Sequence, residues 1–262
     1  MTIIDLGKIT LNTCVDGTEG NPWIVLSNSL GANLSMWEPQ IATLSAKYRI
    51  LRYDTRGHGK SSTPEGPYSL SDLVGDAIAL MDRMKIENAS WMGLSMGAMT
   101  GMGLALEHGD RFKRMVLADA RADAPASFRN MWDERIAKIE NGGTEAIADG
   151  TLGTWLTSEF RKVKPKTSEW LRAMIVATDD RGYIACARGL KNLNYLFRLG
   201  EVALPVLYVG GSDDPGAPPT VMREMADATP GASYVEIPNA AHIANVNKPD
   251  EFNRAIASFL GV

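Results

Sequence analysis

The residues Trp91-Met92-Gly93-Leu94-Ser95-Met96-Gly97-Ala98-Met99 carry the clearest structural signal in the chain, because they join a buried strand to a helix at one serine. The apolar run at 89–94 predicts the strand, and residues 96–108 predict the helix. A turn this sharp strains the backbone of Ser95 and requires small neighbours, which Gly93 and Gly97 supply. We therefore expect the Ser95 hydroxyl to project from the sheet beside the free N–H groups of a helix N-terminus, which stabilise negative charge.

Short apolar runs, typical of strands buried on both faces, recur along the chain at residues 23–26, 48–53, 115–118, 205–209 and 233–237. Helical segments at 36–46, 73–81 and 249–260 alternate with them. This alternation predicts an α/β fold with a mostly parallel central sheet and helices on both faces. Residues 8–16 alternate apolar and polar side chains, which predicts a strand that begins a hairpin around 17–21.

The pattern changes between residues 122 and 197. Buried strands disappear there, and helical stretches rich in Trp and Met occupy residues 128–140, 147–160 and 167–178. We predict that 122–197 form a helical cap inserted over the carboxyl edge of the sheet, while 1–121 and 198–262 form the core. The alternative is that these helices are a further layer of the core.

Composition limits the possible partners. The chain has 262 residues, of which 27 are Lys or Arg and 31 are Asp or Glu, so it has no basic excess that would favour nucleic acid or an anionic membrane. No apolar run approaches the roughly 18 residues of a membrane helix, and the first residues do not resemble a secretion signal. The two cysteines, Cys14 and Cys186, lie far apart and predict reduced thiols in a cytoplasmic protein. The composition leaves the oligomeric state open.

A nucleophilic serine needs a base, and the chain has only three histidines. His58 lies in a glycine-flanked turn, and His108 lies at the end of the helix predicted after Ser95, so each has a structural explanation. His242 lies in a loop between the last strand and the last helix, at the sheet edge where Ser95 is expected. We predict that His242 is the base.

Three aspartates are candidates for the acid that orients this histidine. Asp213 and Asp214 lie in the loop that directly follows the strand predicted at 205–209, and the fixed φ of Pro215 restrains this loop beside Asp214. Asp119 directly follows the strand predicted at 115–118. All three would lie at the same edge of the sheet as the serine.

Taken together, these motifs resemble those of the α/β-hydrolases over essentially the whole chain. They are the serine turn, Asp54-x-Arg56-Gly57-His58-Gly59-x-Ser61, Gly211-x-x-Asp214-Pro215 and the late His242. Family members with this proline place the acid directly before it, which favours Asp214, and the order Ser95, Asp214, His242 matches the family triad. The chain departs from the family at Ser27-Asn28, where most members carry His-Gly.

Other segments are similar to 3-oxoadipate enol-lactonases. They are residues 26–31 followed by Met36-Trp37, Trp132-Asp133-Glu134-Arg135-Ile136, Trp155-Leu156-Thr157, and His242-x-x-Asn245. The resemblance implies an enzyme of the β-ketoadipate pathway of aromatic catabolism that opens a small-molecule lactone through an acyl-enzyme, with no metal and no organic cofactor. Three alternatives stay open: a carboxylesterase, a carbon–carbon bond hydrolase of aromatic ring-cleavage products, and a non-catalytic small-molecule receptor on the same fold.

The remaining predicted site residues follow from this mechanism. The backbone N–H of Met96 and, from the resemblance, that of Ser29 would bind the oxyanion. Leu30, Trp132 and Trp155 are candidates for substrate contact. A lactone of this type carries a free carboxylate, and the cations that are candidates to bind it are Arg121, Arg135, Arg188 and Lys191.

Overall fold

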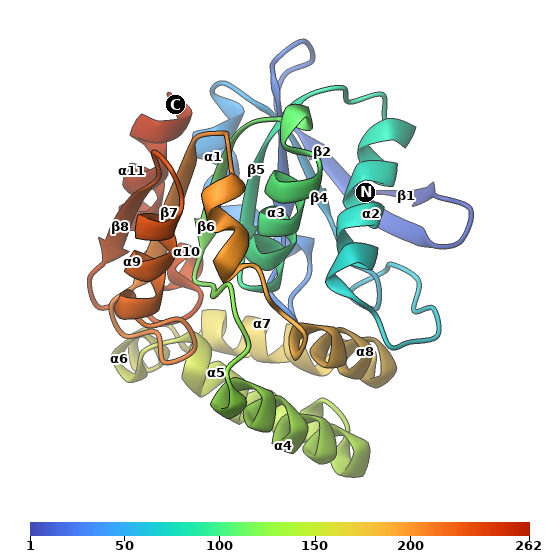
Figure 1. The fold of residues 1–262 in the computed structure, drawn as a ribbon. Helices are drawn as coiled ribbons and strands as arrows, with labels where there is room; N and C mark the ends of the chain where they lie inside the picture. Colours follow the sequence, from blue (N-terminus) through green and yellow to red (C-terminus); the bar gives the residue numbers. More distant parts are fainter.

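Eight strands form one sheet in the order β1-β2-β4-β3-β5-β6-β7-β8 in the computed structural model, which describes residues 1–262 (Figure 1). The strands are β1 (Thr2–Asp5), β2 (Thr10–Asp16), β3 (Trp23–Ser27), β4 (Arg49–Tyr53), β5 (Ala89–Leu94), β6 (Phe112–Ala118), β7 (Val206–Gly211) and β8 (Ser233–Ile237). β2 pairs antiparallel with β1 and β4, and every other pairing is parallel. The predicted mostly parallel sheet is therefore confirmed.

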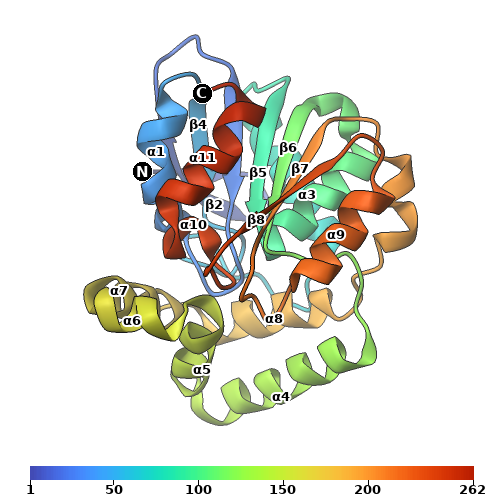
Figure 2. The same cartoon turned by 90° about the vertical axis from the view of Figure 1, so that its left-hand side faces the viewer.

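Helices cover both faces of this sheet. The core helices are α1 (Glu38–Ser45), α2 (Leu70–Arg83), α3 (Met96–Glu107), α9 (Pro219–Ala228), α10 (Ala244–Asn247) and α11 (Pro249–Leu260), with short 3₁₀ turns η1 (Leu34–Trp37) and η2 (Gly109–Arg111). α1 and α11 lie on one face, whereas α3 and α9 lie on the other (Figure 2), and α2 packs beside α3 (Figure 1). This arrangement follows from the crossover connections that parallel strands require. No helix is long and apolar enough to cross a lipid bilayer.

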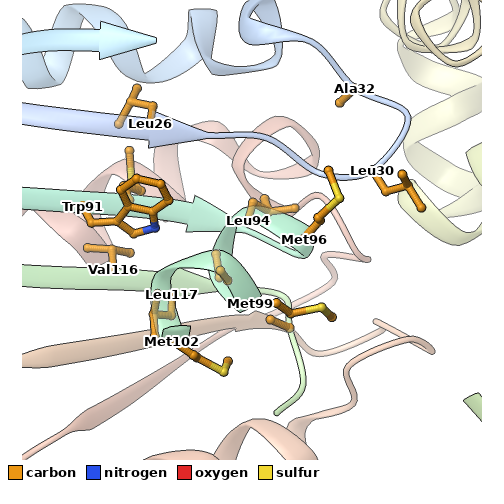
Figure 3. Packing of buried hydrophobic residues seen from close by; sticks show 14 of the residues in the cluster. Leu26, Leu30, Ala32, Trp91, Leu94, Met96, Met99, Met102, Val116 and Leu117 are labelled. Carbon is orange, nitrogen blue, oxygen red and sulfur yellow. The ribbon is translucent and has the colours of Figure 1, made fainter. Parts of the chain in front are cut away.

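The centre of the core is the pair β5 and α3. Every residue of β5 is buried. The helix α3 is also buried around most of its circumference, and its own side chains are mostly small or Met, which lets its neighbours pack closely against it. The Trp91 ring is completely buried, and its indole N–H donates to the Gly97 carbonyl at 3.1 Å, which ties the strand to the first turn of α3. Figure 3 shows Met96, Met99 and Met102 following the sharp turn after Leu94. The turn that carries the serine is thus rigid on both sides.

Five helices lie together across the carboxyl edge of the sheet (Figures 1 and 2). They are α4 (Ala126–Gly142), α5 (Glu145–Trp155), α6 (Ser158–Val163), α7 (Pro165–Val176) and α8 (Asp180–Leu190), and we call them the cap helices. All lie within residues 122–197, and the turn η3 (Leu196–Glu201) crosses the predicted end of that segment. The entering and leaving chains are joined by a β-bridge between Asp123 and Asn194.

Some local predictions are wrong. The hairpin expected around residues 17–21 does not form, since β2 pairs with β1 and β4 and not with β3. The helix expected at 147–160 is two helices, because the backbone is extended at Leu156 and Thr157 starts a new helix by accepting the Phe160 N–H. Helices α8 and α9 and strand β1 were not expected at all. None of these differences alters the edge at which the candidate site lies.

Candidate active site

Ser95 occupies the predicted strained turn between β5 and α3. Its φ of 55° and ψ of −115° lie in a region that non-glycine residues rarely adopt. A Cβ atom on Gly93 would lie 2.1 Å from the Gly97 carbonyl oxygen, and one on Gly97 would lie 2.1 Å from the Ser27 carbonyl oxygen. Only glycine fits at either position, so the reason inferred from sequence for the two glycines is confirmed.

The structure brings Ser95, His242 and Asp214 into one hydrogen-bonded chain. The Ser95 Oγ lies 2.9 Å from His242 Nε2, and His242 Nδ1 lies 2.8 Å from Asp214 Oδ2. Because the Asp214 carboxylate can only accept at this contact, Nδ1 carries the proton and Nε2 is left to accept from the serine hydroxyl. The second Asp214 oxygen accepts the Gly216 N–H at 2.7 Å, which fixes the carboxylate.

The other two aspartates make no hydrogen bond to the histidine. Asp213 is exposed and accepts the hydroxyl of Ser212. Asp119 is completely buried and accepts the backbone N–H groups of Gly211 and Ala244. Of the three candidates, only Asp214 hydrogen bonds to His242.

The other histidines have structural contacts. The buried His58 accepts the Gly31 N–H through Nε2 at 3.0 Å and lies 3.1 Å from the Arg56 carbonyl through Nδ1. Burial lowers the pKa of His58, so the ring is neutral and serves to hold the loop after β3. His108 lies at the C-terminus of α3, where its N–H donates to the Leu104 carbonyl.

Charge around His242 determines its pKa. Burial lowers this pKa, but the Asp214 carboxylate outweighs burial through its charge and its hydrogen bond, so the pKa of His242 lies above its ordinary value. Burial and the nearby Asp214 charge raise the pKa of Asp119. The site therefore stabilises an imidazolium, which is the state a general base reaches after accepting a proton.

Two backbone N–H groups beside Ser95 have no acceptor in the protein. One belongs to Met96, the first residue of α3, and the other to Leu30 in the loop after β3. The Ser29 N–H, by contrast, is directed at Met36 Sδ at 3.5 Å. The expected role of Ser29 in binding the oxyanion stays a prediction, and Leu30 is a further candidate one residue along the loop.

A cavity of about 320 Å³ opens over Ser95 and His242. Ser29, Leu30 and Met99 line it from the core, while Trp132, Arg135, Trp155 and Tyr183 line it from the cap helices. Figure 3 shows Leu30 on the loop after β3, beyond the carboxyl end of β5. The predicted contact residues Leu30, Trp132 and Trp155 thus share one cavity with the serine. Tyr183 was missed, because α8 was not expected and a lone tyrosine gives no signal.

The four candidate cations differ in their partners. Arg121 pairs with Asp123 at 2.9 Å, Arg188 pairs with Glu140 at 3.1 Å, and Lys191 pairs with Asp133. Arg135 lines the cavity, lies over the Trp132 ring at 5.3 Å and donates to the Tyr183 hydroxyl at 3.3 Å, with no carboxylate partner. Arg135 is the only one of the four with an uncompensated charge in the cavity.

This sheet topology, with a serine at the sharp turn between β5 and α3, is that of a hydrolase with an α/β fold. Comparison with known proteins gives the same class. The chain belongs to the α/β-hydrolase fold family, whose profile matches residues 22–249. Within it, the chain is enol-lactonase-like. It is 34% identical to 3-oxoadipate enol-lactonase 2 of Acinetobacter baylyi over 257 residues, covering 96% of this chain and 93% of that protein.

Two further relatives are similar over the same extent. 3-oxoadipate enol-lactonase 1 of the same organism is 30% identical, covering 96% of this chain and 93% of that protein. The crystal structure of the enol-lactonase from Burkholderia xenovorans LB400 superimposes with a TM-score of 0.96 at 38% identity, and each chain is covered completely. The predicted family and the predicted hydrolase class are confirmed.

Proposed function

We propose that this protein opens an enol-lactone resembling 3-oxoadipate enol-lactone, through an acyl-enzyme on Ser95. The observation that carries the proposal is the Ser95–His242–Asp214 hydrogen-bonded chain at the floor of a cavity whose wall holds the unpaired guanidinium of Arg135. The similarity to enol-lactonases over the whole chain supports the choice of substrate class. We place the reaction in the cytoplasm, within aromatic catabolism.

The first step is ring opening. His242 Nε2 accepts the Ser95 hydroxyl proton as Oγ attacks the lactone carbonyl, and Asp214 stabilises the imidazolium that forms. The tetrahedral intermediate collapses by breaking the ring C–O bond, so the enol oxygen leaves and takes up a proton from His242. The enol then becomes a ketone, and this tautomerisation makes ring opening effectively irreversible.

The second step is deacylation. His242 accepts a proton from a water molecule, whose oxygen attacks the acyl carbonyl. Collapse of the second tetrahedral intermediate returns the proton to Ser95 Oγ and releases the carboxylic acid. Each step leaves the Asp214–His242 pair as it began, so neither step requires a metal or organic cofactor.

We propose Met96 and Leu30 as the donors that bind the oxyanion. Both have free N–H groups, and Met96 adds the favourable dipole at the N-terminus of α3. We favour Leu30 over Ser29, the donor expected from the sequence, because the Ser29 N–H is directed at Met36 Sδ at 3.5 Å. Each donor typically lowers the barrier by about 3 kcal/mol.

We propose that Arg135 binds the free carboxylate of the substrate. Its guanidinium has no carboxylate partner in the protein, so an incoming carboxylate would complete a charge-assisted hydrogen bond. Stacking on Trp132 and contact with Tyr183 hold the guanidinium in place. The cap helices would therefore select the substrate, and the core would supply the reacting groups.

The test compares 3-oxoadipate enol-lactone with p-nitrophenyl acetate, using the native chain and Ser95→Ala. We expect rapid lactone opening, slower ester hydrolysis, and loss of both in Ser95→Ala. Ester cleavage without lactone opening would keep the serine mechanism and discard the lactonase in favour of a carboxylesterase. Full activity in Ser95→Ala would contradict the mechanism itself.

A further inference from the structure

Asp119 is a buried carboxylate that the mechanism above leaves unused. It directly follows β6, has no solvent exposure, and adopts a φ of 47° that is unusual for a residue with a side chain. A conformation of this kind persists only where the surroundings hold it, and it occurs most often at functional sites. The strain at Asp119 therefore calls for a reason beyond filling the core.

The two oxygens of Asp119 contact two different loops. Oδ1 accepts the N–H of Gly211 at 2.8 Å, and Oδ2 accepts the N–H of Ala244 at 3.1 Å. Gly211 ends β7 and lies three residues before Asp214, whereas Ala244 begins α10 and lies two residues after His242. One side chain thus joins the loop that carries the acid to the loop that carries the base.

This bridge bears on the contact between the acid and the base. The bond between Asp214 Oδ2 and His242 Nδ1 is 2.8 Å long and forms between residues on these two loops. The two loops also bond to each other directly before His242, where the Ser212 N–H donates to the Ile237 carbonyl at 3.0 Å and the Asp213 N–H donates to the Ala240 carbonyl at 2.8 Å. The buried Asp119 carboxyl group adds the tie on the other side of His242, at Ala244, and losing either of its contacts would leave a buried polar group unpaired.

We propose that Asp119 is a positioning residue, which sets the geometry of the Asp214–His242 pair by holding the two loops together. This inference rests on the proposed role of Ser95, Asp214 and His242. Asp119 makes no hydrogen bond to the histidine or the serine, and the proposed reaction assigns it no proton.

The position of Asp119 also bears on the pKa of His242. Asp214 and Asp119 both raise the pKa of His242, while burial and Arg135 lower it. Loosening the Asp214 contact weakens the largest influence that raises this pKa, so it acts toward a lower pKa of His242. A change at Asp119 should therefore move the acid limb of the activity profile to lower pH, which a purely structural role would not do.

The test uses Asp119→Asn, which keeps the shape but can accept from only one of the two N–H groups. We expect kcat for p-nitrophenyl acetate to fall by about 10²-fold, KM to change little, and the acid limb to shift to lower pH. Titration of active sites with an organophosphonate separates slow turnover from a smaller folded fraction. A folded Asp119→Asn variant with native kcat and an unmoved acid limb would overturn the proposal.

A second variant covers the case in which Asp119→Asn does not fold. Ala244→Pro removes only the N–H that donates to Oδ2, at the first position of a helix, where proline is tolerated. It should lower kcat in the same way, and native kcat in this variant would also count against the proposal.

The matched control is Thr229→Val. Thr229 is equally buried, and its hydroxyl bonds to Tyr208 and Met225 away from both loops. It should lower the melting temperature and leave kcat unchanged. If Ser95→Ala retains activity, the proposed mechanism fails; if only the two tests at Asp119 fail, the mechanism stands and this inference falls.

Discussion

The two walls of the cavity are built differently. On the core wall, Ser95, Asp214 and His242 are each fixed by hydrogen bonds to one another or to neighbouring backbone, and Ser95 has a strained backbone. On the cap wall, Trp132 and Arg135 contact mainly other side chains, and the Trp132 indole N–H has no partner. We infer that the core wall carries the chemistry, which tolerates little displacement, and that the cap wall carries selectivity.

The two walls are joined by backbone hydrogen bonds at the end of α5. The N–H groups of His242 and Ile243 donate to the carbonyls of Thr154 and Trp155 at the end of α5, at 3.4 Å and 3.2 Å. The Asn247 side chain also accepts from Ala241 and, at 3.4 Å, from Thr157 in the cap. The loop carrying the base is therefore held from both sides, and the cap end of α5 is part of its support.

We expect the largest effect on activity when the nucleophile on the core wall is removed. Ser95→Ala and His242→Ala should each lower kcat by about 10⁴-fold or more, because the two residues act as one unit. Ser127→Ala is the matched control, since Ser127 lines the same cavity and has no hydrogen bond to a histidine. Steady-state kinetics with the lactone measures all three. A large loss of kcat in Ser127→Ala would contradict the assignment of Ser95 as the nucleophile.

The acid offers a comparison between neighbours. Asp214→Asn should lower kcat by up to about 10⁴-fold, whereas the exposed Asp213→Asn should leave it unchanged. The base must be neutral, so the acid limb of kcat/KM reports the pKa of His242, which Asp214 raises. Removing that carboxylate should move the acid limb to lower pH in a pH–rate profile. Equal effects of the two substitutions would contradict the assignment of Asp214 as the residue that orients His242.

Substitutions on the cap wall should change kcat/KM for one substrate more than for another. Arg135→Met should lower kcat/KM for the carboxylate-bearing lactone by about 10- to 10²-fold, the worth of a charge-assisted hydrogen bond, and leave p-nitrophenyl acetate hydrolysis nearly unchanged. Arg188→Met, whose arginine pairs with Glu140 at the surface, is the control. Kinetics with both substrates decides the matter, and an equal loss on the two would place Arg135 in the chemistry.

The smallest effect concerns the contact between cap and core. A Cβ atom on Gly182 in α8 would lie 2.4 Å from the Gly57 carbonyl oxygen, whereas one on Gly150 in α5 would meet nothing within 4 Å. Gly182→Ala should lower the free energy of unfolding by about 1–3 kcal/mol, while Gly150→Ala should be neutral or stabilising. Urea denaturation measures both, and an unaffected Gly182→Ala would mean that α8 moves away easily.

The sequence predicts the core wall well because its signals are local. The serine turn requires Gly93 and Gly97 by sterics alone, and the loop positions of Asp214 and His242 follow from where parallel strands end. The cap wall is harder, since its residues meet only through tertiary packing. Nothing local marks Tyr183 as a neighbour of Arg135, or separates Arg135 from the paired Arg188. Likewise, whether Ser29 or Leu30 has the free N–H depends on where Met36 packs.

One measurement tests the central claim most directly. Because the leaving enol stays tethered to the acyl group, attack by Ser95 on a lactone forms an adduct that contains the entire lactone. We would quench the first turnover with acid and measure the intact mass and then the peptide masses. The account predicts a species heavier by one lactone, mapped to the peptide containing Ser95 and absent in Ser95→Ala. A label on another residue, or full turnover by Ser95→Ala, would contradict it.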